Sequence, residues 1–302
     1  MKRLFLIFAV LFSAFHLGEA EAKLLIAATI PDFASIADEL GGERVETVAL
    51  IRGTQDPHFV DAKPSLILKV NKADLLILAG LDLEVGWLPV LITQSRNPKI
   101  QMGASGYLDA SQCIAPKDVP VAPDRAMGDV HSGGNPHYYT SPEELFKVAW
   151  AIYKKLVELD GVGSEYYERR WKDFEERYEA KLKEWNAKLE KARGTKVVVY
   201  HESWIYLIDW LGFKKEGALE PKPGIPPSPS HVARLLSSVK ERRIKFLFQE
   251  IYYPTRLSEV FSQKSGAKLL VLPSMVGARE EIKNIWEKFD FIVERVTNEK
   301  EN

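Results

Sequence analysis

Two histidines each stand directly after a proline in loop-like stretches of this 302-residue sequence. His58 lies in "TQDPHFVDAKPS" (residues 54–65), and His137 lies in "GGNPHYYTSP" (residues 133–142). Proline fixes its own φ and biases the preceding residue toward extended conformations, so each imidazole should be held at a defined place on a loop. A third histidine, His201, follows the apolar stretch "KVVVY". Because ligands of open α/β sheets bind beyond the carboxyl ends of the strands, we expect these three residues to converge.

Three imidazoles form a donor set for a divalent metal ion. Neutral histidine nitrogens bind zinc at about 2.0–2.1 Å, whereas manganese and calcium prefer more oxygen ligands. An oxygen ligand would complete a tetrahedron, and Glu250, at the end of the apolar stretch "IKFLFQE", could supply it. Glu250 could equally hydrogen-bond a loop or pair with a ligand histidine. The sequence therefore predicts a zinc site of His58, His137 and His201, with Glu250 as the candidate fourth ligand.

Other reactive side chains have plainer interpretations. His131, in the glycine-rich stretch "GDVHSGGNPH", is expected to be exposed, with an auxiliary role in metal capture as the alternative. His231, in "PSPSHVARLL", should lie in the first turn of a helix and be structural. The only cysteine, Cys113, is expected to be a small packing residue rather than a reactive thiol.

The first part of the chain alternates apolar stretches with helical patterns. This alternation is typical of βα units and predicts an α/β lobe with a mainly parallel sheet. The expected strands are residues 23–30, 45–51, 73–80 and 99–105, and the expected helices are residues 32–42 and 63–73.

A long helix should separate this lobe from a second one. Ser141 and Pro142 predict the capped start of an amphipathic helix. The thirty or so residues before Gly194 contain no proline or glycine and place apolar or aromatic side chains every three or four residues, so they predict one rigid helix of roughly 45 Å. Strands at 196–204, 244–250 and 268–274 and helices at 229–243 and 254–266 then predict the second lobe.

The expected organisation is thus α/β, with two lobes joined by one helix and a ligand cleft between them. The expected segments are a signal peptide (1–22), an N-terminal lobe (23–160), the linking helix (161–194) and a C-terminal lobe (195–302). Two loops rich in proline and glycine, residues 113–139 and 219–230, are expected to be shaped walls rather than flexible linkers.

The N-terminus predicts export. Two basic residues, a short apolar run and the A-x-A pattern ending at Ala22 are typical of a secretory signal peptide, and the apolar run is shorter than the roughly 20 residues of a membrane span. No cysteine stands at the predicted cleavage point, so we expect a lipid-free protein in the periplasm. The 41 basic and 42 acidic residues nearly cancel, and no basic cluster indicates a nucleic-acid partner.

Together these motifs resemble a known family. "DPHFVDAKPS", "GNPHYYTSPEEL", "YHESWIYLIDWLGF" and the long helix between them are similar to the cluster A-I substrate-binding proteins of ABC transporters, the zinc and manganese uptake receptors. The resemblance covers the whole mature chain and implies a metal ion between two lobes joined by a rigid helix. It implies His58, His137 and His201 as ligands, and histidine at position 201 favours zinc. The implied function is a monomeric periplasmic receptor that captures zinc and delivers it to an ABC permease.

The sequence departs from this family in two places. The family's fourth ligand is an aspartate in an "LDPLG"-like segment, but the corresponding "VLPSMVGA" (residues 271–278) has Pro273 or Ser274 there. Glu250, a water molecule or an open position must substitute. The chain also lacks the family's histidine-rich acidic loop. The alternatives are a manganese or iron receptor of the same family, or a secreted zinc hydrolase. The hydrolase is less favoured because no H-E-x-x-H, G-x-S-x-G or Walker-type motif is present, so we do not expect an enzyme.

Overall fold

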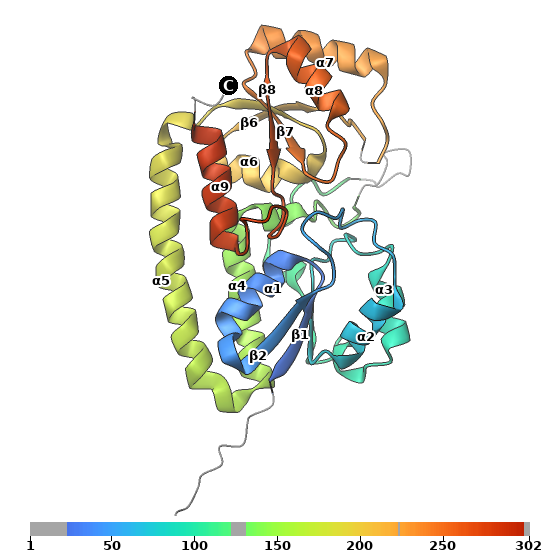
Figure 1. Ribbon diagram of the computed structural model, residues 1–302, viewed down its shortest axis with the longest axis vertical. Helices are drawn as coiled ribbons and strands as arrows, with labels where there is room; N and C mark the ends of the chain where they lie inside the picture. The colour runs from blue at the N-terminus through green and yellow to red at the C-terminus, as the bar shows by residue number, and fades with distance from the viewer. Residues whose placement is uncertain (1–22, 122–130, 223, 299–302) are drawn as a thin grey trace, which may run out of the picture.

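The computed structural model describes residues 23–121, 131–222 and 224–298, so the expected signal peptide lies outside it. Two α/β lobes are stacked and flanked by a long helix (Figure 1). Each lobe contains a four-stranded sheet whose strands are all parallel. The predicted fold class is confirmed. Within the described ranges, no helix is both long and apolar enough to cross a membrane.

The N-terminal sheet has the strand order β2-β1-β3-β4. Its inner strand β3, with the sequence "LLIL", is buried along its whole length because helices cover both faces. The helices α1, α2 and α3 each begin with proline near the first position, where the missing N–H is tolerated. The elements are β1 (Leu24–Ala28), α1 (Pro31–Gly41), β2 (Val45–Ala49), α2 (Pro64–Lys72), β3 (Leu75–Leu78), α3 (Leu88–Ser95) and β4 (Tyr107–Asp109).

The predicted strand at residues 99–105 is wrong. A 3-10 turn (Pro98–Ile100) and a tight turn occupy this segment, and β4 begins only at Tyr107. Gly103 has a φ of +85°, which a strand does not tolerate, and a Cβ at Gly106 would lie 2.1 Å from the Asp74 carbonyl oxygen. The chain therefore turns beside β3 before it pairs with it.

The C-terminal sheet repeats the same arrangement, with the order β6-β5-β7-β8. The predicted strand at 196–204 is too long, because β5 ends at Val199 and residues 202–204 form a 3-10 turn. The edge strand β6, "KKEGA", was not predicted because its exposed charged side chains hide the pattern. The elements are β5 (Lys196–Val199), α6 (Ile205–Leu211), β6 (Lys214–Ala218), α7 (Pro229–Arg242), β7 (Phe246–Glu250), α8 (Arg256–Ser265), β8 (Lys268–Leu272) and α9 (Ile285–Thr297).

Two consecutive helices lie between the two sheets along the chain, and the second of them is the linking helix. α4 (Pro142–Leu159) is followed by α5 (Ser164–Leu189), whose 26 residues lie within the predicted range 161–194. At 1.5 Å per residue, α5 is about 39 Å long. Ser141 occupies the N-cap position of α4, but its side chain makes no capping hydrogen bond, contrary to prediction. One side of α5 is buried through Tyr167, Trp171, Phe174, Tyr178, Trp185 and Leu189.

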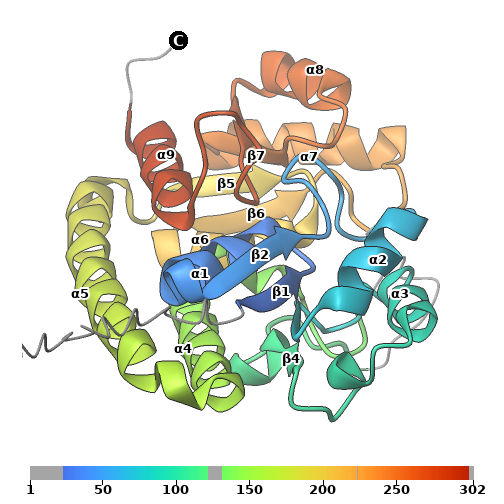
Figure 2. The same ribbon diagram turned by 60° about the horizontal axis from the view of Figure 1, so that its bottom comes forward.

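The last helix, α9, returns from the C-terminal lobe and packs against both α5 and α1 (Figure 2). Lys288 of α9 forms an ion pair with Asp32 of α1, and both side chains are 0% exposed. Lys288 also donates to the Tyr139 carbonyl (2.8 Å), and Asp32 accepts from the Val276 backbone (3.0 Å). Because an unpaired buried charge is strongly destabilising, this network holds the two lobes in one arrangement.

Candidate metal centre

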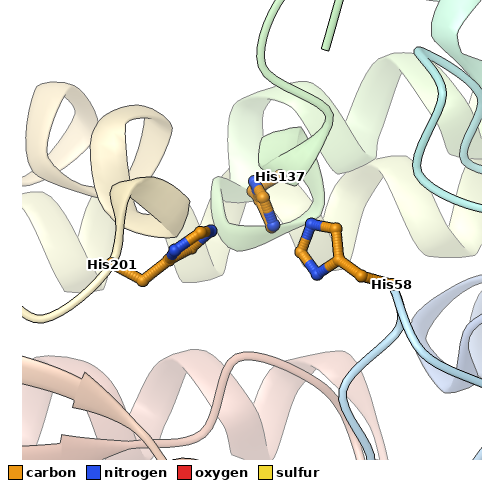
Figure 3. A group of neighbouring side chains, drawn as sticks. All are labelled: His58, His137 and His201. Atoms are coloured by element: carbon orange, nitrogen blue, oxygen red, sulfur yellow. The ribbon is translucent and has the colours of Figure 1, made fainter. Parts of the chain in front are cut away.

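Three histidines meet where the carboxyl edges of the two sheets face each other. His58 lies in the loop after β2, His201 lies two residues after β5, and His137 begins the short 3-10 helix (His137–Thr140) that precedes α4. Their side chains point toward one another (Figure 3). One ring nitrogen of each lies within 4.8 Å of those of the other two, a spacing at which they could hold a metal ion. The structure therefore brings together all three histidines that the sequence singled out.

The ring orientation of each histidine is set by an oxygen partner at Nδ1. His58 Nδ1 lies 2.7 Å from the Asp56 carboxylate, and His137 Nδ1 lies 2.9 Å from the side-chain oxygen of Asn135. His201 Nδ1 lies 2.5 Å from the Glu220 carboxylate. A ring N–H that donates to such a partner leaves the Nε2 lone pair free, which is the usual arrangement around metal-bound histidine.

The two Pro-His pairs have the same local structure. The oxygen of Asp56 accepts the backbone N–H of His58 as well as its ring N–H, and Asn135 does the same for His137, each backbone distance being 3.0 Å. An acidic or amide side chain that bonds the backbone two residues on forms an Asx-turn. The intervening proline favours the turn, so the short motif D/N-P-H orients an imidazole by itself. Trp87 further anchors the first motif by donating to the Pro57 carbonyl (3.0 Å).

Burial leaves His137 with a polar atom that nothing satisfies. Its Nε2 is buried and has no hydrogen-bond partner among the described residues. Burial, together with the neighbouring histidines, holds the pKa of His137 well below its usual value, so the ring is neutral at neutral pH. A buried neutral imidazole with an unused lone pair fits a metal ligand.

His201 has the opposite electrostatic environment. Burial opposes its charged form, but the hydrogen bond that its ring donates to Glu220 and the nearby carboxylates of Glu250 and Asp56 outweigh burial and raise the pKa of His201. A divalent cation would be stabilised by the same negative groups. The centre thus combines imidazole nitrogens with surrounding acidic charge.

Glu250 ends β7 beside this centre but does not belong to the group of three converging histidines. Burial raises the pKa of Glu250 to about 7, although the nearby Ser203 hydroxyl acts in the opposite direction. Neither carboxylate oxygen of Glu250 has a well-aligned hydrogen-bond partner among the described residues. Ser274, in the segment where the resembling family has its aspartate, is likewise buried without a partner in the described part of the chain.

The structure changes the interpretation of His131. This residue is not exposed as predicted but partly buried, with its Nε2 3.3 Å from Nε2 of His58. Burial, followed by the nearby His58, lowers the pKa of His131 to about 4. His231 lies in the first turn of α7, as predicted, and its Nε2 lies 2.9 Å from the Ala218 carbonyl oxygen. Cys113 is half-buried and free.

Glu220 was missed by the sequence analysis. It follows β6, and β6 pairs with β5 in parallel, with Val199 opposite Ala218. Beyond the strand ends, the Glu220 N–H still donates to the Tyr200 carbonyl (2.9 Å), which keeps Glu220 beside His201. The available signal was a carboxylate two residues after a strand, at the sheet edge that carries His201. That strand was itself not predicted.

A profile of the family described as "ZnuA: Zinc-uptake complex component A periplasmic" matches residues 26–292. The chain belongs to this family. It is 23% identical to the zinc-binding lipoprotein AdcA of Streptococcus pneumoniae serotype 4, and the match covers 98% of this chain but 60% of AdcA. It is 22% identical to the manganese ABC transporter substrate-binding lipoprotein PsaA of Streptococcus anginosus, covering 81% of this chain and 77% of PsaA.

Among solved structures, a zinc-bound ZnuA deletion mutant is similar with a TM-score of 0.75 at 23% identity. The match covers 93% of this chain and 99% of that one. The likeness establishes that the whole described arrangement, two lobes and a linking helix, is the ZnuA fold.

Proposed function

We propose that this protein is a periplasmic receptor that binds one zinc ion through His58, His137 and His201 and delivers it to the permease of an ABC transporter. The observation that carries the proposal is the convergence of three histidines whose Nδ1 atoms are all occupied by oxygen partners. Three preoriented Nε2 atoms are a strong donor set for zinc at its usual distance of about 2.0–2.1 Å. Membership of the ZnuA family supports the transport role.

Zinc is favoured over manganese by the nature of the donors. Manganese suits carboxylate, carbonyl and water oxygens, whereas imidazole suits zinc. Here Glu250 is the only one of the proposed ligands that offers oxygen, and it stands outside the three-histidine group. A manganese or iron receptor is the alternative, since PsaA is described as a manganese transporter component.

The proposed receptor binds and releases its cargo without large lobe movements. The helix α5 packs along α1, α4 and α9, and the buried pair of Lys288 and Asp32 joins the lobes. Opening the lobes widely would expose or separate these buried charges, which is unfavourable. We therefore propose that release proceeds by local shifts of the loops that present His58 and His137.

Metal titration of residues 23–302 tests the proposal. Zinc should bind at about micromolar affinity or better, and manganese should bind more weakly. His58→Ala, His137→Ala and His201→Ala should each weaken zinc binding, whereas His231→Gln, which can still donate to the Ala218 carbonyl, should not. Weak zinc binding by the wild type, or unchanged binding in the three alanine variants, would refute the receptor.

Transport and catalysis are tested separately. Loss of the gene should raise the zinc concentration that its host needs for growth. No chemical step is part of the proposal, so zinc-dependent hydrolytic turnover that disappears in His58→Ala would identify the protein as an enzyme instead.

A further inference from the structure

We infer that His131 is the fourth ligand of the proposed zinc site, so that the ion is held by four imidazole nitrogens instead of three and a carboxylate. The inference rests on the proposed function, and it identifies the donor that would make the site prefer zinc to manganese. It concerns a residue outside the three motifs that identify the other ligands.

The distance between His131 and His58 is the first argument. Four nitrogens at about 2.0–2.1 Å from a tetrahedral zinc ion lie roughly 3.3–3.4 Å from one another. The Nε2 atoms of His131 and His58 are 3.3 Å apart. Two nitrogens that share a zinc ion stand at this separation.

The state of His58 is the second argument. Its Nδ1 is committed to the carboxylate of Asp56 at 2.7 Å, so its Nε2 carries a lone pair. The nitrogen of His131 therefore faces a lone pair. Without a metal ion, an N–H at His131 Nε2 can donate to this lone pair. A zinc ion would replace that hydrogen bond by two nitrogen–zinc contacts, and it would also give the buried Nε2 of His137 the partner that it lacks among the described residues. The ring centroid of His131 lies 5.3 Å from that of His58 and 6.1 Å from that of His137.

The backbone around His131 is built to hold it there. The backbone N–H and the hydroxyl of Ser132 both donate to Asp82, at 3.2 and 2.6 Å, and the Gly134 N–H donates back to the His131 carbonyl at 3.2 Å. Gly134 has a φ of +108°, and a Cβ at Gly133 would lie 2.9 Å from the Leu81 side chain. The two glycines of "HSGGNPH" thus allow one short segment to present both His131 and His137.

The competing fourth ligand is Glu250. Neither Glu250 nor His131 belongs to the group of three histidines whose ligand atoms all lie within 4.8 Å of one another. His131 is distinguished from Glu250 by the 3.3 Å between its Nε2 and that of His58. The role that we infer for Glu250 is to place negative charge near the ion, as it does near His201, whose pKa it helps to raise. An all-nitrogen donor set explains how a chain with proline or serine in place of the family's aspartate can still hold zinc and discriminate against manganese.

X-ray absorption of zinc bound to the protein (residues 23–302) tests the inference. The wild type should show four imidazoles at the zinc ion. His131→Ala should show three imidazoles and one oxygen, and its ratio of zinc to manganese affinity should fall by at least about tenfold, or roughly 1.4 kcal/mol. Glu250→Gln should keep four imidazoles. Circular dichroism confirms that each variant is folded.

The outcomes separate this inference from the proposed function. Three imidazoles and one oxygen in the wild type, or a coordination unchanged in His131→Ala, would refute the role of His131 while leaving the receptor intact. An oxygen lost specifically in Glu250→Gln would assign the fourth position to Glu250. Failure of the wild type to bind zinc at all would refute the receptor itself.

Discussion

Glu220→Gln should weaken zinc binding although Glu220 is not a proposed ligand. Glu220 is buried and holds the His201 ring through a contact of 2.5 Å, and its other oxygen accepts the Gly224 N–H at 3.1 Å. Glutamine keeps the size of the side chain but removes the negative charge that makes the imidazole a better donor. Loss of such an outer partner typically lowers metal affinity about 10- to 100-fold, which corresponds to roughly 1.4–2.7 kcal/mol.

The effect should depend on pH with a defined sign. Burial alone would lower the pKa of His201, and Glu220 is the foremost of the groups that outweigh burial and raise it. In the metal-free protein, a raised folded pKa contributes stability below the ordinary histidine value of about 6.5, and this contribution is lost as pH rises through the folded pKa. Metal-free Glu220→Gln should therefore lose more stability at about pH 5.5 than at about pH 8.

Zinc binding should show the reverse trend. In the wild type, a proton on His201 competes with zinc as pH falls. In Glu220→Gln, the pKa of His201 is lower and the proton competes less. The affinity difference between wild type and variant should thus be largest near pH 8 and should shrink toward pH 6.

Competition with a chromophoric zinc chelator across this pH range measures the zinc affinities, and urea titration of the metal-free proteins at about pH 5.5 and about pH 8 measures the difference in stability. Glu202→Gln is the matched control, because Glu202 stands next to His201 in the chain but pairs with Lys215 at the surface. It removes the same charge without touching the ring. If the affinity of Glu220→Gln falls less than about threefold near pH 8, well short of the range for outer partners, or if Glu202→Gln falls equally, the positioning argument fails.

Two further predictions concern the frame that holds the site. Lys288→Met leaves the buried Asp32 carboxylate unpaired and should lower the free energy of unfolding of the metal-free protein by about 3–5 kcal/mol. Urea titration measures this difference, and a loss under about 1 kcal/mol would contradict the prediction. Gly53→Ala should weaken both stability and zinc affinity, because its Cβ would lie 2.1 Å from the Val276 carbonyl oxygen and would displace the loop that presents His58. If the zinc affinity from calorimetric titration and the melting temperature of this variant equal those of the wild type, the prediction is wrong and the loop accommodates the added methyl group.

The sequence alone determined the fold class and three histidines of the proposed site. The inner strands are continuous apolar stretches in the sequence because both faces of each sheet are covered. The D/N-P-H motif orients its own histidine through hydrogen bonds that the first residue of the motif accepts from the backbone and ring of the third. These are local effects, governed by backbone stereochemistry and by which faces of an element are buried. His201 could be found because it lies two residues after a buried strand.

Tertiary structure decided everything that depends on which segments become neighbours. Glu220 reaches His201 only because the charged edge strand β6 pairs with β5, and His131 reaches His58 only because the turn at Ser132 is anchored on Asp82. These pairs are 19 and 73 residues apart in the chain. Periodicity cannot reveal such pairs, because a side chain's partner across loops depends on strand order and loop packing, not on its own flanking sequence.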